Sequence, residues 1–321
     1  MIDTKRLRQK ILDLAIRGKL VPQDPADEPA SVLLERIHQE KLQMVADGKL
    51  KKKDIVNDSV IYLGDGSLHY EKVGDNEPVC IEDELPFELP GGWSWARMGA
   101  FEKLSNGTSK RHGKDGCETI VLRLADLTEH AISLEDTRRI ILTETEREKY
   151  RLNPNDIVFI RVNGSKEKVG KAFVVPKSDD DVAYCDHLMR GEPSGALSSD
   201  LLCFFLSTAY LHNRIKENVV SAAGQNTISQ GSLVSLLIPI PPLAEQQRIV
   251  TALDDLLACV DTIEREQAEL DELLAKTRST SPSAASSCHR IRQTSPHRSS
   301  LNAYTRKSSR WWPTASSRRR T

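Results

Sequence analysis

A heptad repeat near the end of the chain constrains the fold most strongly. Between residues 245 and 276, apolar residues recur at alternating four- and three-residue steps, with one polar position at Gln267. A helix of this length measures roughly 48 Å at 1.5 Å per residue. The narrow stripe favours one helical partner, and packing on the helix's own domain is the alternative. The expected helix-pairing residues are Ile249, Leu253, Leu256, Val260, Ile263, Leu270 and Leu274.

The start of the chain combines helical and hairpin patterns. Apolar residues at helical spacing predict a helix over residues 4–18 and a second one over residues 27–44. Short β-like runs at 60–62 and 69–72 flank a Gly-Asp-Gly turn and predict a small hairpin. The prolines of residues 86–90 then indicate a connector.

The middle of the chain has a mixed pattern. Short β-like runs occur at 119–122, 157–161 and 171–175, and they alternate with charged helical stretches at 142–150 and 199–218. We expect these segments to form one α+β domain of about 150 residues, which is a usual domain size.

The last residues of the chain have an unusual composition. Residues 280–321 contain nine Arg or Lys and no Asp or Glu, which is typical of a disordered basic arm for nucleic acid. A second interpretation starts from codons. All 42 tail residues are compatible with a copy of residues 13–54 read one base out of frame. Our hypothesis is that the DNA holds an internal repeat and that the tail's basic charge carries no functional weight.

Composition excludes several classes of protein. The net charge of −1 does not by itself indicate a nucleic-acid partner. The six cysteines show no CxxC spacing for zinc, so we expect free thiols in a reducing cytoplasm. There is no run of about 18 apolar residues and no secretory leader. We therefore expect a cytoplasmic protein without a membrane partner.

No catalytic motif stands out in the sequence. It has no P-loop, no glycine-rich adenosylmethionine loop and no HExxH pattern. Asp179, Asp180 and Asp181 are adjacent, and a solvated acidic loop explains them better than a metal site. We expect a non-catalytic protein, with a cryptic nuclease or methyltransferase site in residues 91–240 as the alternative.

Several motifs, in a fixed order, resemble those of type I restriction–modification specificity subunits. They are ILDLAIRGKLVPQDP from Ile11, DEPASVLLERI from Asp27, LPGGWSWARMG from Leu89, NDIVFIRVNGS from Asn155 and LIPIPPLAEQQRIV from Leu237. The resemblance extends over about residues 1–276. In that family, two target-recognition domains alternate with helical conserved regions, and each domain reads one half of a bipartite DNA site. This chain has one such domain.

The resemblance implies a fold class and a division of the chain. We expect an α+β fold in which one target-recognition domain is joined to long antiparallel coiled-coil helices. The expected divisions are conserved-region helices at 1–54, a hairpin and connector at 55–88, the recognition domain at 89–240, the conserved-region helix at 241–279 and the out-of-frame tail at 280–321.

The resemblance also implies partners. These are double-stranded DNA, modification (methyltransferase) subunits, a restriction subunit that is an ATP-dependent translocase and nuclease, and a second copy of the chain through the helices. No cofactor is expected on this chain, because adenosylmethionine, ATP and Mg²⁺ belong to the partner subunits. A coiled-coil adaptor that does not touch DNA is the alternative.

Three glycine-containing segments carry the residue types that contact DNA, namely cations for phosphates and forked polar groups for base edges. The candidate DNA-binding residues are Lys110, Arg111, Lys114, Arg161, Asn163, Ser165, Lys166, Lys168, Lys171, Gln225, Asn226 and Thr227.

Each segment also has a structural alternative. Lysines 110 and 114 are compatible with an exposed loop that has no partner. Asn163 and Gly164 match a type I′ turn between strands. Arg161 is placed to form an ion pair with Asp156, and Gln225 with its neighbours to cap or turn the chain.

Overall fold

The computed structural model describes residues 2–51, 55, 58–128 and 131–280, and the chain separates into two units at 1–270 and 271–321. The predicted tail lies outside the described residues apart from Thr280. In the second unit, the described residues 271–280 are helical. None of the described helices is long and apolar enough to span a membrane.

The mixed helical and stranded fold that the sequence predicts is confirmed. The long helices are α1 (Thr4–Ile16), α2 (Ala30–Ala46) and α8 (Leu243–Thr280). The shorter helices are α4 (Glu144–Tyr150), α5 (Ser199–Leu206), α6 (Ala209–Glu217) and α7 (Gln230–Val234).

Five small sheets complete the architecture of the described residues. The hairpin sheet has the order β1 (Ser59–Leu63), β2 (His69–Val73), β3 (Val79–Cys80), and a two-stranded sheet joins β15 (Leu237–Ile240) to β4 (Ser94–Arg97). The central sheet has the order β10 (Ala172–Val174), β8 (Ile157–Ile160), β12 (Leu188–Pro193), β5 (Glu102–Asn106). The others run β11 (Val182–Tyr184), β6 (Cys117–Leu122), β7 (Arg139–Leu142) and β13 (Val220–Ala222), β14 (Gln225–Thr227), β9 (Val162–Asn163).

Two main cores cover the two faces of β8. The larger core gathers buried residues of α1, α2, α5, α6 and α8 together with Ile157 and Phe159 of β8. The second core contains Val158 and Ile160, which alternate with them, and the buried residues of β6, β7 and β11. The strand is apolar throughout because both of its faces are covered.

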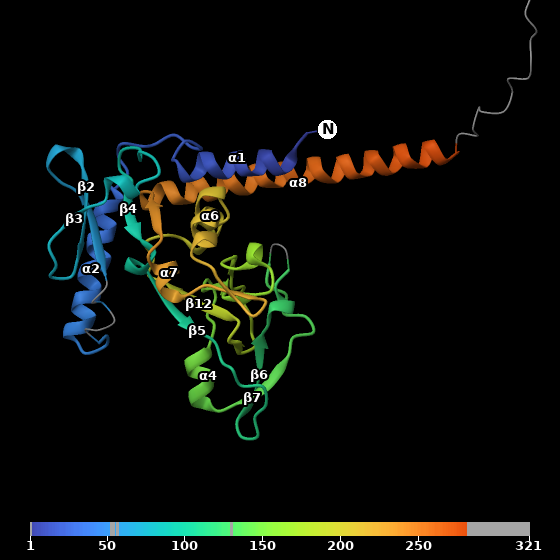
Figure 1. The fold of residues 1–321 in the computed structure, drawn as a ribbon, viewed down its shortest axis with the longest axis horizontal. Helices are drawn as coiled ribbons and strands as arrows, with labels where there is room; N and C mark the ends of the chain where they lie inside the picture. Colours follow the sequence, from blue (N-terminus) through green and yellow to red (C-terminus); the bar gives the residue numbers. More distant parts are fainter. Residues whose placement is uncertain (1, 52–54, 56–57, 129–130, 281–321) are drawn as a thin grey trace, which may run out of the picture. The chain divides into compact units, whose positions relative to one another are not determined.

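Helix α1 runs antiparallel along the first part of α8 (Figure 1). The backbone N–H of Ile2 donates to Gln267 at 2.9 Å, and Arg8 forms an ion pair with Asp261. Residue numbers therefore increase along the first helix in the direction in which they decrease along α8, so the two helices are antiparallel. Side chains of both helices share the larger core.

The predicted helix over 199–218 is instead two helices. Ser207 and Thr208 separate α5 from α6, and the Thr208 side chain accepts a hydrogen bond from the N–H of Leu211 at 3.3 Å. Thr208 is thus the N-cap of α6, a role that threonine hydroxyls commonly fill. The stretch 142–150 also divides, because Leu142 ends β7 and the helix begins at Glu144.

Candidate nucleic-acid interface

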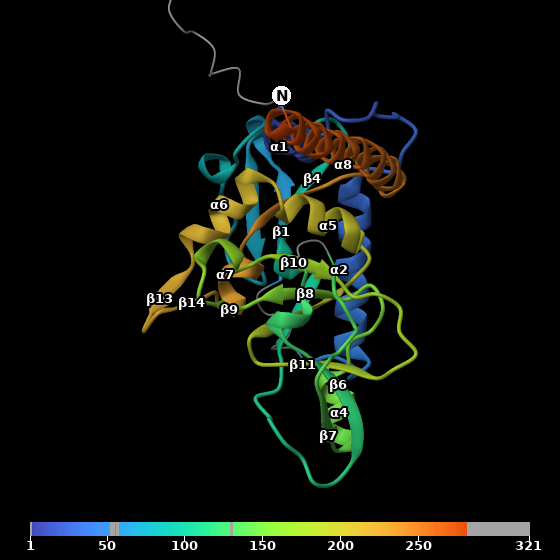
Figure 2. The same ribbon diagram turned by 90° about the vertical axis from the view of Figure 1, so that its right-hand side faces the viewer.

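Two of the three candidate segments become neighbours in one small sheet. Strand β14 pairs antiparallel with β9, so that Asn226 lies opposite Asn163 and Thr227 opposite Val162. Figure 2 shows β13, β14 and β9 side by side. The segments around residues 161–171 and 221–229 are distant in sequence, and strand pairing brings their polar residues to one place.

The two asparagines hold this sheet and its loops together. The Asn226 amide Nδ2 donates to the carbonyl of Gly164 at 2.9 Å, and its Oδ1 accepts from the Ser221 hydroxyl at 2.5 Å. Asn163 Oδ1 accepts from the N–H of Ser165 at 2.9 Å. Gln225 is exposed, and its side chain has no hydrogen-bond partner among the described residues. Gln225 is therefore the amide of this group that is free to contact a ligand.

The interpretation of Asn163–Gly164 as a type I′ turn is wrong. Neither residue has a positive φ, which both central positions of that turn require. The turn with this geometry lies instead between β13 and β14, where Ala223 and Gly224 have φ of 48° and 78°. That hairpin carries Gln225 at the start of β14.

Lys166, Lys168 and Lys171 form an exposed cationic patch beside β9. Lys166–Lys168 is a short 3-10 helix, and none of the three lysines forms an ion pair with a described residue. Glu167 between them contacts α6 instead, with Lys216 at 2.7 Å and His212 at 3.3 Å. Lys216 and His212 lower the pKa of Glu167. The three lysine charges thus remain available to an external anion.

Gly170 fixes the position of this lysine loop. Its φ is +80°, and a Cβ there would lie 2.3 Å from Cγ2 of the buried Ile215 in α6. Only glycine combines this backbone conformation with so close an approach. The loop consequently packs on α6 while its lysines stay in solvent.

Asp186 connects this region to the first candidate segment. Its carboxylate accepts from Arg111 Nη2 at 3.0 Å and lies 3.2 Å from His187 Nδ1, and its carbonyl accepts from Arg161 Nη1 at 3.1 Å. Burial acts to raise the pKa of Asp186, but Arg111 and His187 lower it overall. The alternative ion pair of Arg161 with Asp156 is not found, since Asp156 binds Arg190 at 2.7 Å.

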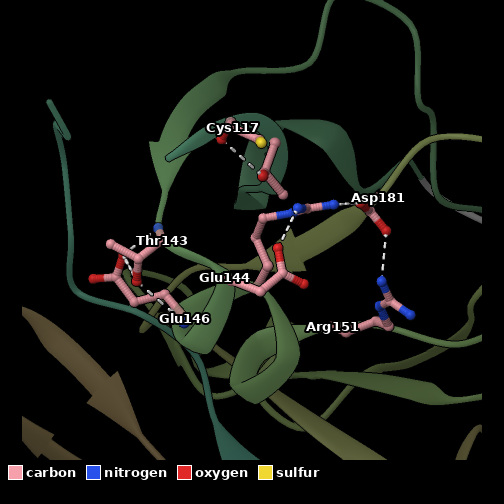
Figure 3. A network of polar contacts seen from close by, with 8 residues as sticks. Cys117, Thr143, Glu144, Glu146, Arg151 and Asp181 are labelled. Carbon is pink, nitrogen blue, oxygen red and sulfur yellow. Dashed lines mark hydrogen bonds and ion pairs between the residues drawn. The ribbon is translucent and has the colours of Figure 1, made fainter. Parts of the chain in front are cut away.

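Lys110 is committed to another contact. Its Nζ lies 2.6 Å from Oε2 of Glu146, which also accepts from the N–H of Thr143 at 2.9 Å. Figure 3 shows Glu146 and Thr143 together at the start of α4. Lys114, in the same segment, is exposed and forms no ion pair with a described residue. Lys114 is therefore the candidate of this segment whose charge is unpaired, since Arg111 is itself paired with Asp186.

Two of the adjacent acids at 179–181 are paired with arginines. Asp181 is held by Arg147 and by Arg151, the latter at 3.0 Å (Figure 3), and Asp180 lies 3.2 Å from Arg139. These arginines supply the positive charge that a cation would provide.

One cluster of metal-type ligands occurs within the described ranges, formed by Cys185, Asp186 and His187. Burial raises the pKa of the Cys185 thiol, which disfavours the thiolate that binds metals. Asp186 already accepts from Arg111. The cluster does not fit a metal ion.

Buried polar residues at the start of α8 were not predicted as functional. Gln246 donates to the carbonyl of Ala196 at 2.7 Å and accepts from the N–H of Ser198 at 3.0 Å. Glu245 accepts from the indole N–H of Trp93 at 3.0 Å, and burial raises its pKa. We call Glu245, Gln246 and Arg248 the α8 anchor. Their signal in the sequence is four consecutive polar residues, EQQR at 245–248, at the start of an apolar seam.

Arg248 completes the α8 anchor through the N-terminal segment. Its Nη2 lies 2.5 Å from Asp27, which lies three residues before α2 begins at Ala30. The anchor thus ties α8 to Asp27, to Trp93 directly before β4 and to the loop before α5.

The predicted helix-pairing residues divide into three groups. Ile249, Leu253 and Val260 are fully buried in the larger core, and Ile263 is half-buried. Leu256 is 39% exposed, and Leu257 is buried in its place. The buried positions advance by four, four and three residues because a straight helix drifts from a strict seven-residue repeat. Leu270 and Leu274 are exposed.

Comparison with known proteins gives a consistent family. The model of the type I restriction modification DNA specificity domain matches residues 120–272. The EcoAI specificity subunit of Escherichia coli is 32% identical over 255 residues, which are 78% of this chain and 39% of that protein. The EcoEI specificity subunit of Escherichia coli is 30% identical over 268 residues, 80% of this chain and 41% of that one.

A crystal structure of the HsdS subunit from Thermoanaerobacter tengcongensis is similar at a TM-score of 0.43 and 20% identity, over 76% of this chain and 53% of that one. The chain spans about two fifths of the length of the two curated relatives. On the sequence matches, this chain belongs to the family of type I restriction–modification specificity subunits.

Proposed function

We propose that this chain is the DNA-reading component of a type I restriction–modification complex. Its recognition domain reads one half of a bipartite target. The observation that carries the proposal is the pairing of β9 with β14. This pairing brings Asn226, the neighbour of the exposed Gln225, opposite Asn163, which precedes the loop of the exposed Lys166, Lys168 and Lys171. Sequence-specific DNA binding needs two kinds of group. Cations contact the phosphates, and a free polar group such as an amide contacts the base edges.

The helices α1 and α8 supply the docking surface for the methyltransferase and restriction subunits in this proposal. Adenosylmethionine, ATP and Mg²⁺ act on those subunits, and the chain itself is non-catalytic and cytoplasmic. The exposed leucines of α8, among them Leu270 and Leu274, are the surface through which a second copy would pair.

Binding of the complex to DNA tests the reading function. The chain is assembled with its methyltransferase subunits, and the methylated motif is identified by single-molecule sequencing of genomic DNA. Anisotropy titrations then compare a duplex that carries the motif with a scrambled duplex. Reversing Lys166, Lys168 and Lys171 to Glu should weaken binding about 100-fold or more. It should also reduce the slope of log K against log salt by about 3.

A control variant separates a local effect from a change in net charge. Lys72, Lys103 and Lys149 lie on β2, β5 and α4, which do not pair with β9 or β14. Reversing these three lysines makes the same change in net charge and should leave affinity within about threefold. Equal effects of the two triple variants, or no effect of the first, would contradict the proposed interface.

A further inference from the structure

A hollow lined by three arginines lies next to the contacts of Asp186. It has a volume of about 260 Å³, and its walls include Arg111, Arg123, Arg138 and His187. Arg123 precedes a short 3-10 helix after β6, and Arg138 directly precedes β7. The hollow borders the proposed reading surface, because Arg161 donates through its backbone N–H to the carbonyl of His187 at 2.8 Å.

Each of the three guanidinium groups uses only some of its N–H donors for contacts within the protein. Arg111 uses Nη2 toward Asp186 at 3.0 Å. Arg123 uses Nε and Nη2 toward Asp126 at 3.2 and 2.8 Å. Arg138 uses Nη2 toward the carbonyl of Arg111. A guanidinium has five N–H donors, and the Nη1 groups of all three arginines have no partner within the described ranges.

The charges in the hollow favour an anion. Asp186 and Asp126 balance Arg111 and Arg123, whereas Arg138 contacts only a carbonyl and has no carboxylate partner among the described residues. One positive charge is therefore uncompensated. Forked N–H donors around one positive charge match the oxygens of a phosphate group.

We propose that this hollow binds a phosphate of the DNA backbone, with Arg138 as the residue that supplies the net charge. The inference rests on the proposed function, since it names a further contact of the same DNA surface. A phosphate contact is independent of base sequence. The hollow accordingly positions the duplex, and Gln225 with its neighbours discriminates between sequences.

Substitution of Arg138 tests this assignment without leaving a carboxylate unpaired. In the assembled complex, Arg138→Gln should weaken binding of the motif duplex and of the scrambled duplex by the same factor, about 3- to 10-fold. The slope of log K against log salt should fall by about 1. Arg139→Gln is the matched control, because Arg139 is adjacent and exposed but does not line the hollow. It should change neither quantity.

The outcomes separate this inference from the proposed function. If the wild-type complex does not distinguish the motif duplex from the scrambled one, the proposed function itself fails. If it does, but Arg138→Gln keeps the wild-type slope or weakens one duplex only, the phosphate site is wrong and the function stands. Inorganic phosphate is titrated at constant ionic strength as a second probe. Displacement of DNA by this phosphate beyond that of chloride, lost in Arg138→Gln, would support the proposal. Phosphate that binds the complex through Arg138 without displacing DNA would assign the hollow to a free anion and overturn it.

Discussion

The α8 anchor and the β9–β14 region use similar polar residues in opposite environments. Gln246 is 2% exposed and makes three hydrogen bonds, to Ala196, Ser198 and Pro241. Gln225 is exposed and makes none with a described residue. A buried amide without partners costs about 1–3 kcal/mol, whereas an exposed one is satisfied by water. The comparison separates residues that hold the fold from residues that are free to bind.

Glu102 is one of the buried polar groups of the described residues that depart from this pattern. Its side chain is 4% exposed, and neither carboxylate oxygen has a hydrogen-bond partner among the described residues. Burial, with Asp156 and Glu192 nearby, raises its pKa to about 8. The folded state therefore holds a proton that the unfolded chain releases near pH 4.5.

The largest expected effect follows from that proton. Stability from Glu102 is fully present below its unfolded pKa and is lost as pH rises through its folded pKa. Between pH 5 and 8 this loss amounts to about 4 kcal/mol. Glu102→Gln keeps a neutral group at this position. In urea unfolding, the free energy of unfolding of the variant should therefore rise relative to that of the wild type by this amount between pH 5 and 8. Parallel curves for the two proteins would contradict the buried, protonated carboxyl.

Removal of the Gln246 amide should destabilise the fold next most strongly. Gln246→Ala leaves the buried carbonyls of Ala196 and Pro241 and the part-buried N–H of Ser198 without this partner, at a cost of about 3 kcal/mol in the free energy of unfolding. The neighbouring Gln247 is exposed, and Gln247→Ala should change that free energy by less than about 0.5 kcal/mol. Chemical denaturation measures both, and similar values would remove the distinction between anchor and surface.

Adjacent residues of β14 sharpen the comparison within a single strand. Asn226→Ala removes the bond to Gly164 and should lower stability by about 1 kcal/mol. Gln225→Ala should leave stability unchanged but reduce discrimination between base pairs by about 1–3 kcal/mol at one position. Unfolding and DNA titrations together make the test, and it fails if the two variants exchange their effects.

The smallest effect is expected at Lys110. Because its charge is already paired with Glu146, Lys110→Ala should change DNA affinity less than Lys166→Ala does. Lys110 lowers the pKa of Glu146, so the stability from this pair is present above the unfolded pKa and is lost as pH falls. A double-mutant cycle between residues 110 and 146 measures the coupling. A larger loss of DNA affinity from Lys110→Ala than from Lys166→Ala would exclude this assignment.

Periodicity predicted the helical part of the fold well. The repeat of apolar residues located α1 and α8, because the buried face of a helix produces apolar residues at a fixed spacing in the local sequence. The limit of this periodicity appears at Leu256, which was predicted to pair but is exposed, whereas its neighbour Leu257 is buried. Four- and three-residue steps describe a supercoiled pair, whereas this helix follows its own straight repeat along a short partner. The break at Thr208 was missed because helical residues occur on both sides of it.

The candidate site was predictable by residue type but not by arrangement. Nothing local indicates that Asn226 lies opposite Asn163, because strand pairing between distant segments depends on the whole fold. Asp186 and His187 were missed for the same reason, since their role arises from contacts with Arg111 and Arg161. The Ala223–Gly224 turn escaped prediction because alanine rarely takes a positive φ.

Exchange of the recognition domain tests the central claim most directly. Residues 89–240 are replaced by the matching segment of a relative with a different target, and the chimera is expressed with the methyltransferase subunits. Single-molecule sequencing then reports the methylated adenines across the genome. We predict that the half of the motif assigned to this domain changes to that of the donor. An unchanged motif, in cells where methylation continues, would contradict sequence reading by this chain.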